Sequence, residues 1–515
     1  MTLPSRIRTL RDDESGFALV IASSLMALLA TLSVTLLAVI QSENVRSRRD
    51  TKANSAYHAA EAGMNAYLSD LTESSVFPTA YMAKGEATRT DANGVAHAGN
   101  PSADTPWNAA SWGNTWTYVT PKANDLDWFN LGNGYQYLVQ VYPANPALQG
   151  QAGAITRIVA TGRPCATFDG AGACVGGSRD VSTWRTIETM IRPSSLADFQ
   201  TFSATSITYG SSATTYGPIF VGEDKFGNVG NLTHTGTAKA NLYAEGTIFG
   251  TPTLQNGAQR YDKTTTPTAI CKLNNCNPIP FSTFSSTITT VAGAAAGGGI
   301  SLAATDPTNS ALSGQSYNVD AWKVAFQSNG TLLVSSCKKY SVTVSRITTT
   351  YEVYDGTNPP VCGSARSYNV PSNGAIYSPV AVIVSGVVKG RVTVASNGNI
   401  VVGGDTTYAM PGNDVLGLEA QGTIYFAPYA IMNNQLTCWA ATLSLNGPFQ
   451  ADPNWGGGAT ATFNFFGSTA TYGGITMSNL FAVRNYNYDT NLRFLQPPYF
   501  PSLGNAYVIL VQRQV

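Results

Sequence analysis

The chain has 515 residues, including 49 Gly and 26 Pro, and its 30 basic residues balance its 30 acidic ones. This balance excludes a strongly basic nucleic-acid coat and an acidic tail, and 43% hydrophobic residues exclude a disordered chain. Only 12% of the residues are charged, about half the usual share. The composition therefore favours a β protein rich in Gly, Thr, Ser and Asn over a helical enzyme.

A long apolar segment follows a polar N-terminus that carries Arg6, Arg8 and Arg11. Residues 17–40 read FALVIASSLMALLATLSVTLLAVI and contain no charge. As a helix this segment would cover roughly 36 Å, which is enough to cross a bilayer. It is too long for the apolar core of a cleaved secretory signal. The upstream arginines predict a cytoplasmic N-terminus and a single pass, with the C-terminus outside.

The same helix is predicted to continue to about residue 71. No proline occurs between Pro4 and Pro78, and apolar residues recur at three- and four-residue steps from Ala53 to Leu71, which marks one apolar face. The first half, residues 17–40, would be the membrane segment and the second half an amphipathic support. A signal anchor with a helical stalk is the alternative interpretation.

The junction Gly16-Phe17 resembles that of class III signal proteins, the type IV pilins and the type II secretion pseudopilins. In these families a short charged leader ends in Gly, before a long apolar helix. The segment 57–63, YHAAEAG, also resembles a stretch of PilX-like minor pilins. The resemblance implies that residues 1–16 are a prepilin leader. It further implies that a prepilin peptidase cleaves after Gly16 and methylates Phe17, and that other major and minor pilins and the inner-membrane pilus assembly machinery are partners.

The fifth position of the mature chain departs from the family pattern. Major pilins have Glu there, whereas this chain has Ile21. In the family that carboxylate neutralises the amino terminus of a neighbouring subunit inside an apolar core, where an unpaired charge is costly. A terminal subunit does not need to offer this partner. We therefore expect a minor pilin at or near the pilus tip, although a type II secretion pseudopilin would share every N-terminal feature.

Residues 72–193 are predicted to form the small sheet of a pilin head. A loop-like region over 72–114 is followed by alternating apolar and polar residues in four segments, 115–120, 134–142, 155–160 and 181–191. Such segments predict an antiparallel sheet that receives the helix on one face. The expected fold class is therefore α+β, with a large all-β domain after the head.

Short cysteine loops predict an oxidising compartment. Cys165 with Cys174, and Cys271 with Cys276, are candidate local disulfides. Buried free thiols are the alternative, and no pairing follows from the sequence for the three remaining cysteines, Cys337, Cys362 and Cys438.

The β domain is predicted to span residues 194–470 as a β-solenoid, interrupted by a surface insertion at 251–374. Ile376, Ile400 and Ile424 stand 24 residues apart, which suits stacked coils; a β-sandwich is the alternative. Residues 471–515 would close the domain, and the apolar run at 507–512 suits a sheet edge, with a return to the head as one option. Residues 375–408, 413–426, 484–489, 492 and 496–501 resemble large pilin-like proteins that carry a β-solenoid, including DNA-uptake minor pilins.

No catalytic residue, metal site or cofactor is predicted. The nearest carboxylate group is Asp405, Asp414 and Glu419, and these residue types in a Gly-rich β region are typical of turns. A membrane-anchored β-helix enzyme acting on polysaccharide is the alternative function. Such enzymes need clustered acids, and these three carboxylates are the nearest candidates.

Lys338, Lys339, Tyr340 and Arg346 form a candidate DNA contact, since Lys and Arg bind phosphates and an aromatic ring stacks on bases. A solvated charge pair on a strand is the simpler interpretation. The sequence thus predicts a minor pilin of the inner membrane and then of the extracellular pilus. Its surface domain would serve adhesion to a host or abiotic surface, or capture extracellular DNA, and the subunit would take part in pilus assembly.

Overall fold

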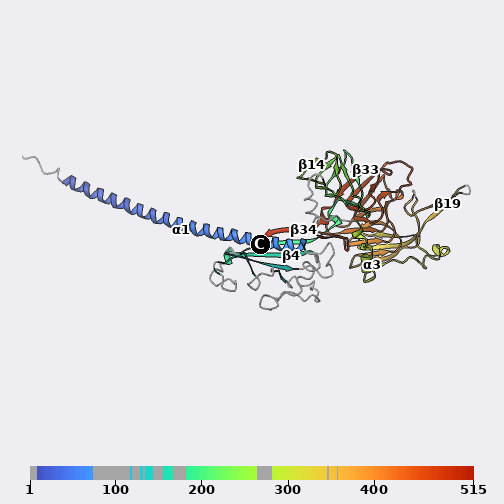
Figure 1. The fold of residues 1–515 in the computed structure, drawn as a ribbon, viewed down its shortest axis with the longest axis horizontal. Helices are drawn as coiled ribbons and strands as arrows, with labels where there is room; N and C mark the ends of the chain where they lie inside the picture. Colours follow the sequence, from blue (N-terminus) through green and yellow to red (C-terminus); the bar gives the residue numbers. More distant parts are fainter. Residues whose placement is uncertain are drawn as a thin grey trace, which may run out of the picture.

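The computed structural model describes residues 9–73, 116–118, 128–131, 134–142, 155–165, 167, 181–263, 281–344, 347–355 and 358–515. A single long helix projects from a mass of β structure, and the C-terminus lies beside that helix (Figure 1). The predicted α+β class is confirmed, with one long helix, a small antiparallel sheet and a large β domain.

The helix α1 (Thr9–Glu73) is continuous across the apolar and amphipathic halves of its sequence. Its C-terminal half seats on the sheet through small residues and a few larger ones: Ala53, Ala56, Ala59, Ala60, Met64, Tyr67 and Leu68 are all buried. The approach is close, because a Cβ on Gly162 of the sheet would lie 1.8 Å from the Ala56 carbonyl oxygen. Only glycine therefore fits at that contact.

The sheet under the helix, here called the head sheet, is antiparallel. Its strand order is β1-β3-β4-β5-β34, with β2 also paired to β3. The strands are β1 (Trp116–Tyr118), β2 (Phe129–Asn130), β3 (Tyr135–Tyr142), β4 (Thr156–Pro164), β5 (Arg185–Ser195) and β34 (Ser502–Gln514). The C-terminal strand therefore returns to the head and covers β5, whose edge would otherwise be free.

The large domain is a parallel β-solenoid with three faces. Its first face is a continuous parallel ladder that does not follow chain order. In spatial order the strands are β16 (Ile300–Ser301), β23 (Ala375–Ser378), β25 (Arg391–Ser396), β27 (Val415–Ala420), β29 (Gln435–Ser444), β31 (Ala461–Thr471), β6 (Thr201–Ser203), β9 (Ile219–Val221), β12 (Leu242–Ala244) and β15 (Arg260–Tyr261). The earliest coils in sequence thus stack on the last coil.

This order divides the solenoid into two blocks. The early block comprises residues 201–261 and the late block residues 300–488, and β31 and β6 join them through the pairs Thr469–Thr201, Ala470–Phe202 and Thr471–Ser203. The predicted coils are present, but their stacking order was not foreseen, because parallel pairing leaves no mark of order in the sequence.

The second and third faces are each split between the two blocks. On the second face the late block has β17 (Ala321–Phe326), β24 (Ala381–Val388), β26 (Ile400–Tyr408), β28 (Ile424–Phe426), β30 (Phe449–Ala451) and β32 (Ile475–Thr476), and the early block has β7 (Ile207–Tyr209), β10 (Leu232–His234) and β13 (Ile248–Phe249). On the third face β33 (Phe481–Tyr488) ends the late block, and β8 (Thr214–Thr215), β11 (Thr237–Ala238) and β14 (Thr253–Leu254) form the early block.

Coil length varies, and this corrects the predicted period. Ile400 and Ile424 are register partners, as the 24-residue step suggests. Ile376, however, pairs with Val394 on the first face, not with Ile400, whose partner on the other side is Val382. The spacing from 376 to 400 is therefore coincidental, because corner turns of different lengths change the number of residues in each coil.

The predicted insertion at 251–374 is also only partly separate from the solenoid. Strand β17 pairs in parallel with β24, and β16 with β23, so residues 300–301 and 321–326 belong to the first late coil. Strand β18 (Thr331–Lys338) continues this sheet antiparallel to β17, and the hairpin of β19 (Tyr340–Val344) and β20 (Ile347–Tyr351) extends beyond it (Figure 1). The region as a whole is rich in Ser and Thr, which gave it the pattern of a surface segment, although β17 contains neither.

Aromatic residues fill the solenoid interior. The Phe426 ring lies 4.6 Å from that of Phe449 and 4.8 Å from that of Phe463, measured between centroids. All three are at most 1% exposed, and burying each contributes about 1.5–3 kcal/mol. Outside the first face, α3 (Thr287–Ala296) packs Ile288 and Val291 against the sheet as a cover.

Candidate assembly interface and external surface

The N-terminal half of α1 presents bare apolar side chains. From Leu19 to Ile40 its large apolar residues are 51% to 73% exposed. Among the described residues this is the one helix long and apolar enough to cross a membrane. Hydroxyls in this half are satisfied within the helix, as when Ser24 Oγ donates to the Val20 carbonyl at 2.7 Å and Ser33 Oγ to the Leu29 carbonyl at 2.8 Å. The surface is therefore apolar in practice as well as in sequence.

A polar collar separates this apolar half from the head sheet. Residues 41–52 are exposed and include Arg46, Arg48, Arg49 and Lys52 beside Glu43 and Asp50. The first buried side chain of α1 among the described ones is Ala53. At 1.5 Å per residue the collar spans about 18 Å, so the head stands away from the apolar segment.

The residues of the predicted leader junction lie inside α1. Gly16 and Phe17 are helical, but their side chains fall outside the described set. Ile21 is 51% exposed and faces away from the rest of the chain. Cleavage and methylation at this junction stay predictions.

The head and the solenoid meet at a joint built on Arg192, which sequence inspection did not single out. Its guanidinium is fully buried, binds both carboxylate oxygens of Asp198, with Nη1 to Oδ2 at 3.0 Å, and donates from Nε to the Arg493 carbonyl at 2.8 Å. Ser195 Oγ also donates to Gln496 Oε1 at 2.5 Å. The joint therefore ties the chain entering the solenoid to the chain leaving it, about 300 residues later.

The head sheet contains a second buried charge cluster. Glu188 on β5 is 2% exposed and accepts from Arg157 Nε on β4 and from Arg513 Nε on β34, the latter at 2.7 Å. The hydrogen bond from Arg157 holds the pKa of Glu188 below its usual value, against the opposing effect of burial, and the bond from Arg513 adds to it. Glu188 thus links three adjacent strands.

The candidate DNA contact lies where β18 meets the projecting hairpin. Lys339 Nζ is 2.8 Å from Glu352 Oε1, and the Lys339 amide donates to Asp320 Oδ2 at 2.8 Å. Arg346 and the Tyr340 side chain lie outside the described set, and Lys338 ends β18. Glu352 therefore already pairs with one of the two lysines, Lys339. DNA contact stays a prediction.

The cysteines divide into three cases. Cys165 is disulfide-bonded, whereas Cys174, Cys271 and Cys276 lie outside the described residues. Cys337 and Cys362 form a disulfide between the register partners of β18 and β21 (Val361–Cys362), a pairing that sequence spacing did not reveal. Cys438 is a buried free thiol, and burial raises its pKa to about 12. It is therefore not a nucleophile at neutral pH.

The carboxylates considered for an enzyme have separate roles. Asp405 accepts from the Thr437 amide at 2.7 Å, and Asp414 accepts from the Gly390 and Met410 amides, which fixes a turn. Glu419 is fully buried in β27, and neither carboxylate oxygen has a hydrogen-bond partner among the described residues. The described residues hold no cluster of three or more His, Cys, Asp or Glu that could bind a metal.

Comparison with known proteins finds only distant structural likeness. No family model and no curated protein matches the chain. Among solved structures, the competence-associated pilin ComZ from Thermus thermophilus is 14% identical over 90% of this chain and 98% of that chain, with a TM-score of 0.26. A TM-score this low does not establish a shared fold.

Proposed function

We propose that the protein is a minor subunit of a type IV pilus. The observation that carries the proposal is the division of α1, whose apolar N-terminal half is bare while its C-terminal half seats on an antiparallel sheet. A bare apolar helix of this length needs either lipid or the apolar helices of neighbouring subunits around it. A membrane precursor that passes into a helical filament core supplies both in turn.

The large β domain would then be the external part of the subunit. It is joined to the head through Arg192 and lies at the end of the molecule opposite the apolar helix (Figure 1). With the polar collar at the membrane surface, the solenoid would face outward, where disulfides such as Cys337–Cys362 are stable. Adhesion to a surface and capture of DNA are the two roles that suit such a domain.

The position proposed within the filament is at or near the tip. Ile21 offers no carboxylate to a neighbouring amino terminus, and a charge left unpaired in an apolar core is costly. A shaft subunit must provide this partner at every repeat, whereas a terminal subunit need not. Immunogold label confined to pilus ends supports this position, and even labelling along the shaft contradicts it.

N-terminal sequencing of the protein recovered from sheared, purified filaments tests the proposed function. We expect the chain to begin at methylated Phe17. Gly16→Val should block processing and remove the protein from filaments, while the neighbouring Ser15→Ala should leave both unchanged. Recovery only in membranes, with the leader retained, would contradict the proposal and favour an anchored protein.

The DNA role has its own test. If the candidate patch binds DNA, the double variant Lys338→Ala, Lys339→Ala should weaken binding several-fold and reduce the slope of log K against log salt by about 2, because each lysine would neutralise one phosphate. Glu352→Gln, which removes the acid beside Lys339, should strengthen binding. Unchanged affinity in both variants rejects the patch as the DNA contact.

A further inference from the structure

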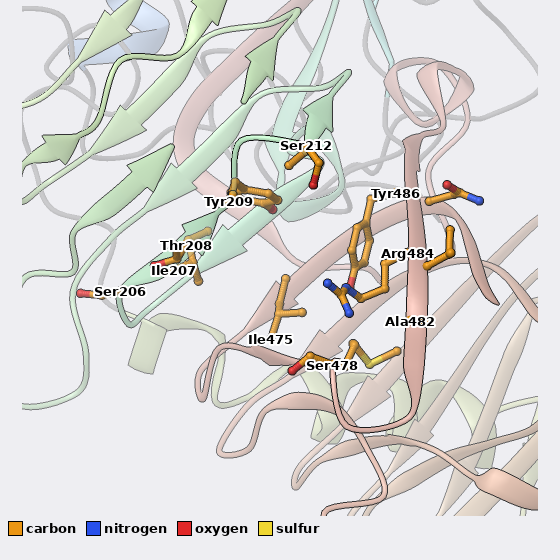
Figure 2. A pocket seen from close by; sticks show the side chains of 15 residues that line it. Ser206, Ile207, Thr208, Tyr209, Ser212, Ile475, Ser478, Ala482, Arg484 and Tyr486 are labelled. Atoms are coloured by element: carbon orange, nitrogen blue, oxygen red, sulfur yellow. The ribbon is translucent and has the colours of Figure 1, made fainter. Parts of the chain in front are cut away.

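In the described part of the chain, the boundary between the two solenoid blocks lacks a β-ladder on two of the three faces, although β33 comes close to β8. The first face crosses it through the β31–β6 ladder. On the other faces, the described residues give β32 and β33 ladder partners only in the late block, and β7 and β8 partners only in the early block. A cleft of about 770 Å³ opens there, lined by residues 206–210, 212–213, 475, 477–478 and 482–486 (Figure 2).

The walls of this cleft are strand edges. A strand with one neighbour directs the N–H and C=O groups of alternate residues to its free side, and β33 has eight residues. The Tyr486 carbonyl is one such group, because it accepts from Gln200 instead of from β31. By alternation, the main-chain groups of Arg484 point to the same free edge.

Gln200 shows which chemical group fits between the blocks. Gln200 is buried, with 2% of its surface exposed. Nε2 donates to the Tyr486 carbonyl at 3.3 Å, and Oε1 accepts from the amides of Tyr216 and Gly217, each at 2.7 Å. A primary amide thus bridges late and early blocks as a peptide unit of an inserted strand would. Tyr486 also lines the cleft, so the bridge and the cleft meet at this residue.

The side chains in the cleft add a preference for one charge. Arg484 is the only charged residue in the lining, and within the described residues it has no carboxylate partner. It lies beside Tyr486 (Figure 2). Much of the remaining lining is small or hydroxylic, with Ser206, Ser212 and Ser478. An acidic side chain is therefore complementary to the site.

We infer that the cleft is a docking site for an extended segment of a partner polypeptide, which adds as a β-strand to the free edge of β33 and places an acidic side chain against Arg484. The main chain of that segment would continue the hydrogen bonding that the Gln200 amide begins at Tyr486. It would thereby join the two blocks on the second and third faces. Strand addition supplies affinity through main-chain hydrogen bonds and selectivity through alternate side chains. The inference does not depend on the chain being a pilus subunit.

A synthetic peptide tests the inference with the full chain in detergent micelles. The probe has about eight residues, the length of a common strand, with alternating Thr and Val and one central Glu. It is labelled for fluorescence anisotropy. We expect binding, together with slowed hydrogen exchange at residues 484–487. A twin peptide N-methylated at alternate residues should bind at least about 10-fold more weakly, because it cannot donate to the edge.

Variants separate the two parts of the inference. Arg484→Gln should weaken binding of the Glu peptide about 5- to 10-fold and leave a Thr-substituted peptide unchanged. Ala482→Trp should fill the cleft and abolish binding, whereas Ser367→Trp, on the exposed strand β22 (Arg366–Asn369) outside the lining, should not. Equal binding of the N-methylated twin, absence of peptide binding, or protection of residues 484–487 only by a sulfated oligosaccharide or single-stranded DNA would each overturn it.

Discussion

The head sheet and the solenoid solve the problem of buried polarity in opposite ways. The head and its joint bury charges in pairs, with Glu188 held by Arg157 and Arg513 and Arg192 held by Asp198. The solenoid holds its buried carboxylates mostly on main-chain amides, as at Asp262 and Asp414, and its least exposed one, Glu419, has no partner among the described residues. Paired charges tie together strands distant in sequence, whereas a repeated coil achieves this through pairing alone. The two regions should therefore respond oppositely to mutation and to pH.

Loss of the Arg192 guanidinium should have the largest effect. We expect Arg192→Met to lower the free energy of unfolding by about 3–5 kcal/mol, because it leaves the mostly buried Asp198 carboxylate without its charge partner. Chemical denaturation of the full chain in micelles measures this change. The matched control is Arg185→Met on the same strand, whose described bonds go only to the nearby carbonyls of Ser182 and Trp184 and which should cost less than about 1 kcal/mol. Equal losses of stability in the two variants would show that the buried ion pair of Arg192 is not the source of the effect.

Removal of the unpaired carboxyl should stabilise the solenoid. Burial raises the pKa of Glu419 well above its ordinary value of 4.5. As the pH rises past 4.5, the unfolded chain releases the proton that the folded chain keeps, so folded stability falls. Glu419→Leu should therefore add about 1–3 kcal/mol at about pH 8 and much less at about pH 4. A loss of stability at the higher pH would show that the carboxyl has a stabilising partner.

Glu188 should give the smaller effect and the opposite dependence on pH. Its pKa is lowered chiefly by the Arg157 hydrogen bond, so its contribution is present above the ordinary value of 4.5 and is lost as the pH falls through the folded value. Glu188→Gln should cost about 1–2 kcal/mol at about pH 7 and little at about pH 2. Hydrogen exchange in β4, β5 and β34 locates the effect.

The control for Glu188 is Glu352→Gln. That carboxylate is paired with Lys339, but both side chains are more than one third exposed, so its loss should change stability by less than about 0.5 kcal/mol. If Glu352→Gln proves as costly as Glu188→Gln, burial is not what distinguishes the two pairs.

The sequence predicts the features that depend on local pattern. The charge-free run at 17–40, the helical face from Ala53 to Leu68 and the alternating strands of the head are all visible in it, because burial on one side imposes a period on the residues. The parallel coils are partly visible, as in the Ile400–Ile424 pair. Their class and approximate extent follow from the short apolar runs between glycines.

The remainder depends on contacts between residues far apart in the chain. No sequence pattern near Arg192 predicts that its guanidinium donates to the Arg493 carbonyl. The sequence also does not indicate which cysteine pairs with Cys337. The pairing of Thr201 with Thr469 depends on the early block being stacked on the last coil of the late block, out of chain order. The cleft follows from that rejoining, so the candidate docking site was invisible to sequence inspection.

The return of the chain to the head has a mechanical consequence. Because β5 leads into the solenoid and β34 leads out of it, these neighbouring strands leave the head at the same end, where Ser195 pairs with Ser502. A pull on the solenoid would load both strands in the same direction and would not stretch the ladder between them. The force would pass to the β4–β5 ladder and to the helix seated on the sheet, so the external domain is held as by a two-stranded tether.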